Sequence, residues 1–192
     1  MKPIRAFIAF SLPEPVIAHL RILQKSLRDA GLDDLRFVRP ENIHLTLRFL
    51  GDVDPSAVDA IAGAMAEAAA EAAPLSLTAR GIGAFPAVRK ARVVWAGLAG
   101  ETAELISFRG RVAEALETMG YPREPRRFTA HLTLARVRER RRVEPERLVS
   151  AMESLNALTS PSFSAGELVL FQSDPKPNGA VYTPLRRAPL GG

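Results

Sequence analysis

The segments "HLTLRFLG" at residues 44–51 and "HLTLARV" at residues 131–137 begin with the same four letters. The chain contains three histidines, and two of them are followed by Leu-Thr-Leu. At ordinary frequencies of leucine and threonine, such a repeat arises by chance on the order of one time in a thousand. The repetition therefore indicates a duplicated structural unit.

Each copy of the tetrapeptide has the pattern of a β-strand with two different faces. Side chains alternate along a strand, so His44 and Thr46 share one face and His131 and Thr133 share one face of the second strand. The leucines of each copy lie on the opposite face, where they can anchor the strand to an apolar layer. If the two strands meet, their polar faces place two imidazoles and two hydroxyls in one cleft.

Paired imidazoles suit the cleavage of a phosphodiester. One imidazole takes a proton from the attacking oxygen and the other gives a proton to the leaving oxygen, and both changes are accessible near neutral pH. Threonine hydroxyls and arginine guanidiniums can stabilise the negative charge that gathers on the phosphoryl oxygens. This chemistry needs no metal and no other cofactor.

The elements around the two copies alternate between strands and helices. Each half of the chain contains helices and short strands around one HLTL strand, which predicts a duplicated α+β unit. No Gly-, Ser- or Pro-rich linker separates the halves, so residues 1–192 are expected to form a single domain with two lobes. The expected strands cover 4–10, two runs within 35–51, 75–85, 91–98, 128–137 and a hairpin of 163–173 with 180–188. The expected helices lie within 11–31 and cover about 55–73, 105–120 and 144–155.

Composition bounds the class of protein. The 192 residues contain no cysteine, which excludes disulfides and thiolate chemistry. The N-terminus has neither a signal peptide nor a membrane span, so a cytoplasmic protein without membrane association is expected. Lys and Arg outnumber Asp and Glu by 26 to 21, and arginines concentrate between Tyr121 and Arg142. This excess favours an anionic partner, although a solvated arginine surface has the same composition.

Four other interpretations of the sequence were weighed. The two histidines can serve only as strand residues, as we expect for His19 within the first helix. A zinc site is less consistent with the spacing, because the chain lacks a helical H-E-x-x-H, a further paired histidine and cysteine. The segment Gly81–Pro86 resembles half of a dinucleotide fingerprint but is read as turn chemistry. A non-catalytic RNA-binding module would use the basic surface and keep the histidines as structure.

The paired motifs resemble those of the two-histidine (2H) phosphoesterase superfamily. "HLTLRFLG", "FTAHLTLAR", "RAFIAFSLP", "GAFP" and "RVVWAG" are similar to stretches of its RNA 2′,3′-cyclic phosphodiesterase branch, also called 2′-5′ RNA ligase. The resemblance spans nearly the whole chain. It implies a bilobal α+β fold with pseudo-twofold symmetry, mainly antiparallel sheets and a central cleft lined by one motif from each lobe.

The resemblance also implies roles for individual residues. His44 would be the proton donor and His131 the acceptor that activates water, while Thr46 and Thr133 would hold phosphate oxygens. The substrate would be RNA with a 2′,3′-cyclic phosphate end, or a related cyclic nucleotide, opened to a 2′-phosphate without a metal ion. The reverse reaction would form a 2′-5′ linkage, and we expect the protein to act as a monomer.

Residues beyond the tetrapeptides are harder to place. Arg136 matches an arginine that follows the second motif in related enzymes, but alternation from His131 puts it on the opposite face unless the strand ends or bulges near Ala135. The same count favours Arg48 for the cleft, with an exposed salt bridge as the alternative. It assigns Phe49 to the core, with base stacking as the alternative. Before the second strand, Phe128 can stack on a terminal base, and Arg126 and Arg127 are candidate RNA contacts.

Overall fold

The structure is a computed structural model that describes residues 2–125, 127–177 and 179–191. These residues form nine strands and four α-helices. The strands are β1 Ile4–Phe10, β2 Leu35–Phe37, β3 Leu45–Val53, β4 Leu75–Phe85, β5 Val93–Gly100, β6 His131–Val137, β7 Phe163–Ala165, β8 Glu167–Asp174 and β9 Val181–Pro189. The helices are α1 Glu14–Asp29, α2 Val58–Ala70, α3 Thr102–Glu117 and α4 Pro145–Leu155, with short 3₁₀ helices at Pro40–Asn42, Pro55–Ala57 and Val88–Lys90.

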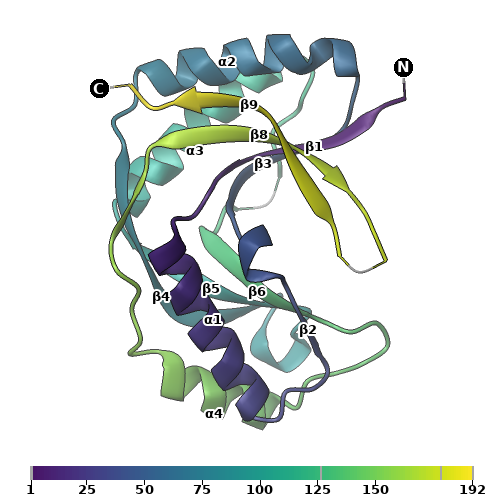
Figure 1. The fold of residues 1–192 in the computed structure, drawn as a ribbon, viewed down its shortest axis with the longest axis vertical. Helices are drawn as coiled ribbons and strands as arrows, with labels where there is room; N and C mark the ends of the chain where they lie inside the picture. The colour runs from purple at the N-terminus through teal and green to yellow at the C-terminus, as the bar shows by residue number, and fades with distance from the viewer. Residues whose placement is uncertain (1, 126, 178, 192) are drawn as a thin grey trace.

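The strands form two antiparallel sheets, each covered by a pair of helices (Figure 1). The first sheet has the order β3-β1-β8-β9 and packs against α2 and α3; together they are called the first lobe. The second sheet has the order β2-β6-β5-β4-β7 and packs against α1 and α4, forming the second lobe. The predicted α+β class with two lobes and mainly antiparallel sheets is confirmed.

The lobes are not the two halves of the sequence. The early strand β2 pairs with β6 in the second lobe, and the late strand β8 pairs with β1 in the first lobe. Two helices are also exchanged: α1 packs in the second lobe and α3 in the first. In Figure 1 the purple β1 accordingly lies beside the yellow-green β8. This exchange ties the two lobes together, because each lobe contains chain from both ends of the sequence.

Most predicted elements are found, with local differences. The expected strand over 163–173 divides at Gly166, because β7 pairs with β4 in the second lobe whereas β8 pairs with β1 in the first. The helix predicted from residue 55 starts with a 3₁₀ turn, where the Asp54 carboxylate accepts a hydrogen bond from the Ser56 N–H, and it ends at Ala70. Most of the segment Gly81–Pro86, read as turn chemistry, belongs to β4, and Gly81 has a φ of 75° where the pairing with β5 shifts register.

The leucines of both tetrapeptides lie in the core, as the alternation predicted. Leu45, Leu47, Leu132 and Leu134 are each no more than 1% exposed. Burying an aliphatic side chain stabilises the fold by about 1.5–3 kcal/mol, so these residues fix both strands firmly against the apolar layers. The partly exposed histidine and threonine of each strand are thereby directed to the other face. Among the described residues, no helix is long and apolar enough to cross a membrane.

Candidate active site

A cleft of about 1130 Å³ contains the polar faces of both tetrapeptides. His44 and Thr46 line it from the first lobe, and His131 and Thr133 line it from the second. Its charged lining is cationic: the described residues around it include no Asp or Glu and four arginines, Arg5, Arg92, Arg127 and Arg136. Two segments far apart in the sequence thus meet in one cleft that favours anions.

Both histidine rings are held by the same kind of hydrogen bond to the backbone. The Nδ1 of His44 lies 2.8 Å from the carbonyl oxygen of Asn42, and the Nδ1 of His131 lies 2.7 Å from that of Thr129. A carbonyl oxygen can only accept, so Nδ1 carries the hydrogen in each ring. The Nε2 atom of each neutral imidazole is then left with a free lone pair, the state that a general base requires.

The surroundings of the two rings differ. His44 stacks on Phe7 with a centroid distance of 4.6 Å and meets the edge of Tyr182 at 5.1 Å. His131 meets Phe85 edge-to-face at 5.0 Å and lies 6.2 Å from Trp95. The His44 ring is therefore stacked on the face of Phe7, whereas the His131 ring has no stacked neighbour among these aromatic residues.

These surroundings shift the proton affinity of both rings. Burial is the main cause that lowers the pKa of His44 from its ordinary 6.5 to about 4, with contributions from the charges of His131 and Arg136. Burial also lowers the pKa of His131, again assisted by the charge of Arg136. The Nδ1 hydrogen bond to the backbone opposes the shift in both cases. Both imidazoles in the free cleft are consequently neutral at pH 7, and they are close enough to influence each other.

A β-bulge in β6 decides where Arg136 points. Trp95 of β5 pairs with Thr133, but the next residue, Val94, pairs with Ala135, so Leu134 is an extra residue in the strand. Leu134 and Ala135 are both buried, and the alternation of faces is shifted by one residue beyond them. Arg136 therefore lines the cleft. Strict alternation from His131, which put Arg136 on the opposite face, was therefore wrong. The bulge lies near Ala135, where Arg136 needed one in order to reach the cleft.

A β-bulge also occurs in β3, and it places two side chains on the faces opposite to those expected. Thr46 pairs with Ala9 and Arg48 with Ile8, which leaves Leu47 as the extra residue. Arg48 was expected at the cleft or in an exposed salt bridge, but it is only 3% exposed and does not line the cleft. Phe49 was expected in the core, but it is 60% exposed and lines the cleft. Both expectations were wrong because they assumed a regular strand.

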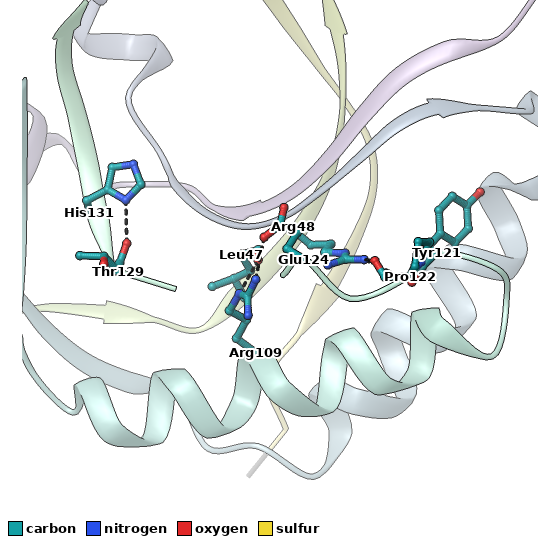
Figure 2. A network of polar contacts seen from close by, with 8 residues as sticks. All are labelled: Leu47, Arg48, Arg109, Tyr121, Pro122, Glu124, Thr129 and His131. Carbon is teal, nitrogen blue, oxygen red and sulfur yellow. Dashed lines mark hydrogen bonds and ion pairs between the residues drawn. The ribbon is translucent and has the colours of Figure 1, made fainter. Parts of the chain in front are cut away.

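Two arginines connect the first tetrapeptide to the segment that leads into the second (Figure 2). A guanidinium nitrogen of Arg48 donates to the backbone carbonyl oxygens of Tyr121 and Pro122. Arg109, on α3, donates from Nε to the carbonyl oxygen of Leu47 at 3.0 Å and forms an ion pair with Glu124 at 2.7 Å. The carbonyl oxygen of the bulge residue thus accepts a hydrogen bond from a side chain of α3.

The loop before β6 contains the remaining predicted contacts. Phe128 is partly buried, and the Arg109 guanidinium lies 4.6 Å from its ring centroid. The guanidinium thereby covers one face of this ring in a cation–π contact, and stacking of Phe128 on a terminal base stays a prediction. Arg127 lines the cleft, whereas Arg126 lies outside the described residues. His19 is buried in α1 and lies outside the cleft lining, in keeping with its expected structural role.

Several residues of the cleft were not identified from the sequence. Phe7, Phe85 and Tyr182 contact the imidazoles, and Arg109 holds the loop that leads to His131. Phe7 and Phe85 lie in the family-like stretches "RAFIAFSLP" and "GAFP" but were not singled out, and no local pattern marked Tyr182 or Arg109. Their importance arises from contacts between distant strands. In the described part of the chain, no three His, Cys, Asp or Glu side chains gather as a potential metal site.

Comparison of the chain with known protein families finds the same duplication. The profile of the LigT-like phosphoesterases matches this chain twice, at residues 10–95 and 97–182, so that each copy of the tetrapeptide falls in one match. The chain belongs to the LigT-like phosphoesterase family. This finding confirms the resemblance that the paired motifs indicated.

Curated relatives in this family extend over nearly the whole chain. A protein of Methanothermobacter thermautotrophicus named RNA 2′,3′-cyclic phosphodiesterase is 33% identical over 94% of this chain and 95% of its own length. One of the same name from Archaeoglobus fulgidus is 32% identical over 95% and 98%.

Solved structures agree on the fold. A crystal structure from Thermus thermophilus matches with a TM-score of 0.80 and 27% identity over 98% of both chains. The apo form of LigT from E. coli matches with a TM-score of 0.76 and 24% identity over the full length of both chains, a likeness that concerns the fold alone. The two-lobed architecture of this phosphoesterase is therefore that of its family.

Proposed function

We propose that this chain hydrolyses the 2′,3′-cyclic phosphate at the end of an RNA and leaves a 2′-phosphate and a 3′-hydroxyl. One observation carries the proposal: two imidazoles from opposite lobes, each with Nδ1 on a carbonyl oxygen and Nε2 available, line a single cationic cleft. The names of the curated relatives supply the class of substrate.

The proposed reaction is an in-line displacement at phosphorus. Nε2 of His131 takes a proton from water while the water oxygen forms a bond to phosphorus. The bond from phosphorus to the 3′ oxygen breaks, and Nε2–H of His44 gives its proton to that oxygen. The two histidines end with exchanged protonation states, and proton exchange with solvent restores them.

The donor role places a demand on His44. Burial holds the pKa of His44 at about 4 in the free protein, so the ring must gain a proton when substrate binds. A phosphodiester anion next to the ring favours the charged form and raises its pKa. We therefore expect substrate binding at pH 7 to be accompanied by proton uptake at the donor.

Thr46, Thr133 and Arg136 are proposed to hold the non-bridging phosphate oxygens. All three line the cleft next to the imidazoles, and a guanidinium can donate two parallel hydrogen bonds to a phosphate. Arg127 is placed to contact RNA phosphates. The protein is expected to need no metal or cofactor and to act as a monomer, since both imidazoles come from one chain.

The reverse reaction would join a 2′,3′-cyclic end to a 5′-hydroxyl through a 2′-5′ bond. Water is abundant and needs no binding site of its own, so hydrolysis should dominate. Incubation with two RNA half-molecules, followed by separation of joined and opened products, measures the balance. A free 2′,3′-cyclic nucleotide presents the same reacting phosphate and should also be opened.

The test uses a short RNA with a 2′,3′-cyclic phosphate end, assayed with and without a strong chelator. We expect turnover that survives chelation and is lost in His44→Ala and in His131→Ala. His19→Gln is the matched control, because this third histidine lies outside the cleft and its loss should leave turnover unchanged. Full turnover in both cleft variants, or salt-sensitive RNA binding without turnover, would overturn the proposal and favour a binding module.

A further inference from the structure

Arg36 lies on β2, the edge strand of the second sheet, next to β6 (Figure 1). Its Cα pairs with that of Arg136, and Arg136 pairs in turn with Val93 of β5. Residues that pair directly across antiparallel strands project from the same face of a sheet. Because Arg136 and Val93 line the cleft, Arg36 stands on the cleft face of the sheet, one strand beyond them.

The opposite face of β2 supports this orientation. Leu35 is buried, and the Arg28 guanidinium of α1 lies 4.2 Å from the ring centroid of Phe37. Helix α1 therefore covers the face that carries Leu35 and Phe37. By alternation Arg36 and Val38 face away from α1, and Val38 lines the cleft. The Arg36 side chain is accordingly exposed beside the cleft.

Arg36 and Arg136 form a pair of like charges. Side chains that are directly opposite on two antiparallel strands have Cβ atoms about 5 Å apart, and like charges at this spacing destabilise a sheet. Among the described residues, neither guanidinium pairs with a carboxylate. Asp34, the residue before β2, has its carboxylate 3.8 Å from the Arg141 side chain instead. Two adjacent cations without an acidic partner are suited to binding an anion.

The next row of the same strand pair differs in its charge. Arg138, just after β6, donates its backbone N–H to the carbonyl oxygen of Asp34 at 2.9 Å, so this row contains an acidic residue as well as a basic one. The uncompensated cations are therefore found in the row that leads directly out of the cleft, at Arg136 and then Arg36.

An RNA offers more than one phosphate to this row. Its reacting end has the cyclic phosphate, for which Thr46, Thr133 and Arg136 are proposed, and every nucleotide before the end adds a phosphodiester. We propose that Arg36 binds the phosphate that joins the terminal nucleotide to the rest of the RNA, so that the strand leaves the cleft across β6 and β2. This inference rests on the proposed function. It makes Arg36 a determinant of substrate length, because a cyclic mononucleotide lacks the joining phosphate.

The test compares adenosine 2′,3′-cyclic phosphate, which has one phosphate, with the dinucleotide ApA 2′,3′-cyclic phosphate, which adds the joining phosphate. Arg36→Gln should raise KM for the dinucleotide by about five- to tenfold, the loss expected for one charge-assisted contact, and leave kcat within about twofold. The same variant should leave KM for the mononucleotide unchanged.

Salt dependence provides a second measurement that needs no turnover. The Kd of an RNA hexamer with a 2′-phosphate end, the proposed product, is followed by fluorescence anisotropy at several salt concentrations. Each phosphate contact on a single strand contributes about 0.7 to the slope of log Kd against log salt concentration. Arg36→Gln should lower the slope by about this amount, and Arg36→Lys, which keeps the charge, should retain it.

Arg187→Gln is the matched control for the change in net charge. Arg187 is an exposed arginine on β9, outside the cleft lining, and it pairs with Glu167. Its replacement should leave both KM values and the salt slope unchanged. Thermal melting checks the fold of each variant. Because Arg36 faces a like charge, Arg36→Gln should melt no lower than the wild type, whereas a merely structural role for Arg36 predicts a lower melting temperature.

The outcomes separate this inference from the function on which it rests. If the wild type opens both substrates and Arg36→Gln equals it on the dinucleotide, the joining-phosphate contact is overturned and the function stands. Equal rises in KM for both substrates would also overturn it, since they would assign Arg36 to the reacting phosphate. If the wild type opens neither substrate, the proposed function fails, and the anisotropy measurement still decides: an unchanged Kd and salt slope in Arg36→Gln would exclude the contact.

Discussion

The two copies of HLTL have the same backbone geometry, but their histidines lie in different surroundings. In both, the histidine Nδ1 binds the carbonyl oxygen two residues earlier, and a bulge follows at the second leucine. His44 is nevertheless stacked on Phe7, whereas His131 meets only ring edges and tilted faces. The repeated letters thus determine where each imidazole points, and the unrepeated neighbours determine how readily it binds a proton.

The two copies also differ at the residue that follows each bulge. The buried fifth residue is Arg48 in the first copy and Ala135 in the second, and only the arginine reaches the backbone of another segment. That segment, residues 121–130, leads into His131. The first copy therefore supports the second, and no equivalent side chain at Ala135 supports the first in return.

The largest expected effect separates the acid from the base. Replacing either cleft histidine with alanine should lower kcat by about 10²- to 10⁴-fold, the usual contribution of one general acid or base. A substrate with sulfur in place of the leaving 3′ oxygen needs no proton on departure, because a thiolate is a stable leaving group. Single-turnover assays should then show recovery in His44→Ala and none in His131→Ala. Recovery in His131→Ala alone would exchange the two roles.

The next largest effect is on stability as a function of pH. Burial lowers the pKa of His44 to about 4, against 6.5 in the unfolded chain, so between these values only the unfolded state binds the proton. The free energy of unfolding should therefore fall as the pH drops from 6.5 to about 4, and His44 should account for about 2–3 kcal/mol of that fall. Urea denaturation of the wild type and His44→Gln at several pH values measures this share. Parallel pH profiles for the two proteins would contradict the prediction.

A smaller effect is expected where the first copy supports the second. Arg109→Ala removes the hydrogen bond to the Leu47 carbonyl and the ion pair with Glu124, in a side chain only 15% exposed. We expect a loss of about 2 kcal/mol in the free energy of unfolding. Arg123→Ala is the matched control, because its ion pair with Glu117 is exposed and should contribute less than about 0.5 kcal/mol. Equal losses in urea denaturation would show that the network adds no stability.

The smallest effect concerns the electrostatic link between the lobes. Burial is the main cause of the lowered pKa of both cleft histidines, and the positive charge of Arg136 contributes to both shifts. Arg136→Gln should therefore raise the pKa of His44 and of His131, as followed by NMR titration of the ring protons. Arg92→Gln, at another arginine of the cleft, serves as the control. Equal pKa shifts in the two variants would show that Arg136 affects the histidines no more than another cleft arginine does.

Much of the fold was predictable because its signals are local. Strand and helix periodicity located nearly every element, and the buried leucines of HLTL followed from alternation. The exchange of β2 and β8 between the lobes was not predictable, because strand pairing depends on the shapes of both sheets. The faces of Arg48 and Phe49 were predicted wrongly for a related reason: a bulge is a relation between two strands and leaves little trace in either one.

The sequence by itself determined the paired histidines and threonines, the face of the strand that each pair occupies, the basic character of the chain and, through resemblance, its family. These properties depend on residue identity and on the two-residue period of a strand, both of which can be read along the chain. The tertiary structure alone decided that the pairs meet in one cleft, that Phe49 and Arg136 face it, and that His44 is the more tightly clamped imidazole. Those properties depend on register and burial, which exist only when distant segments pack together.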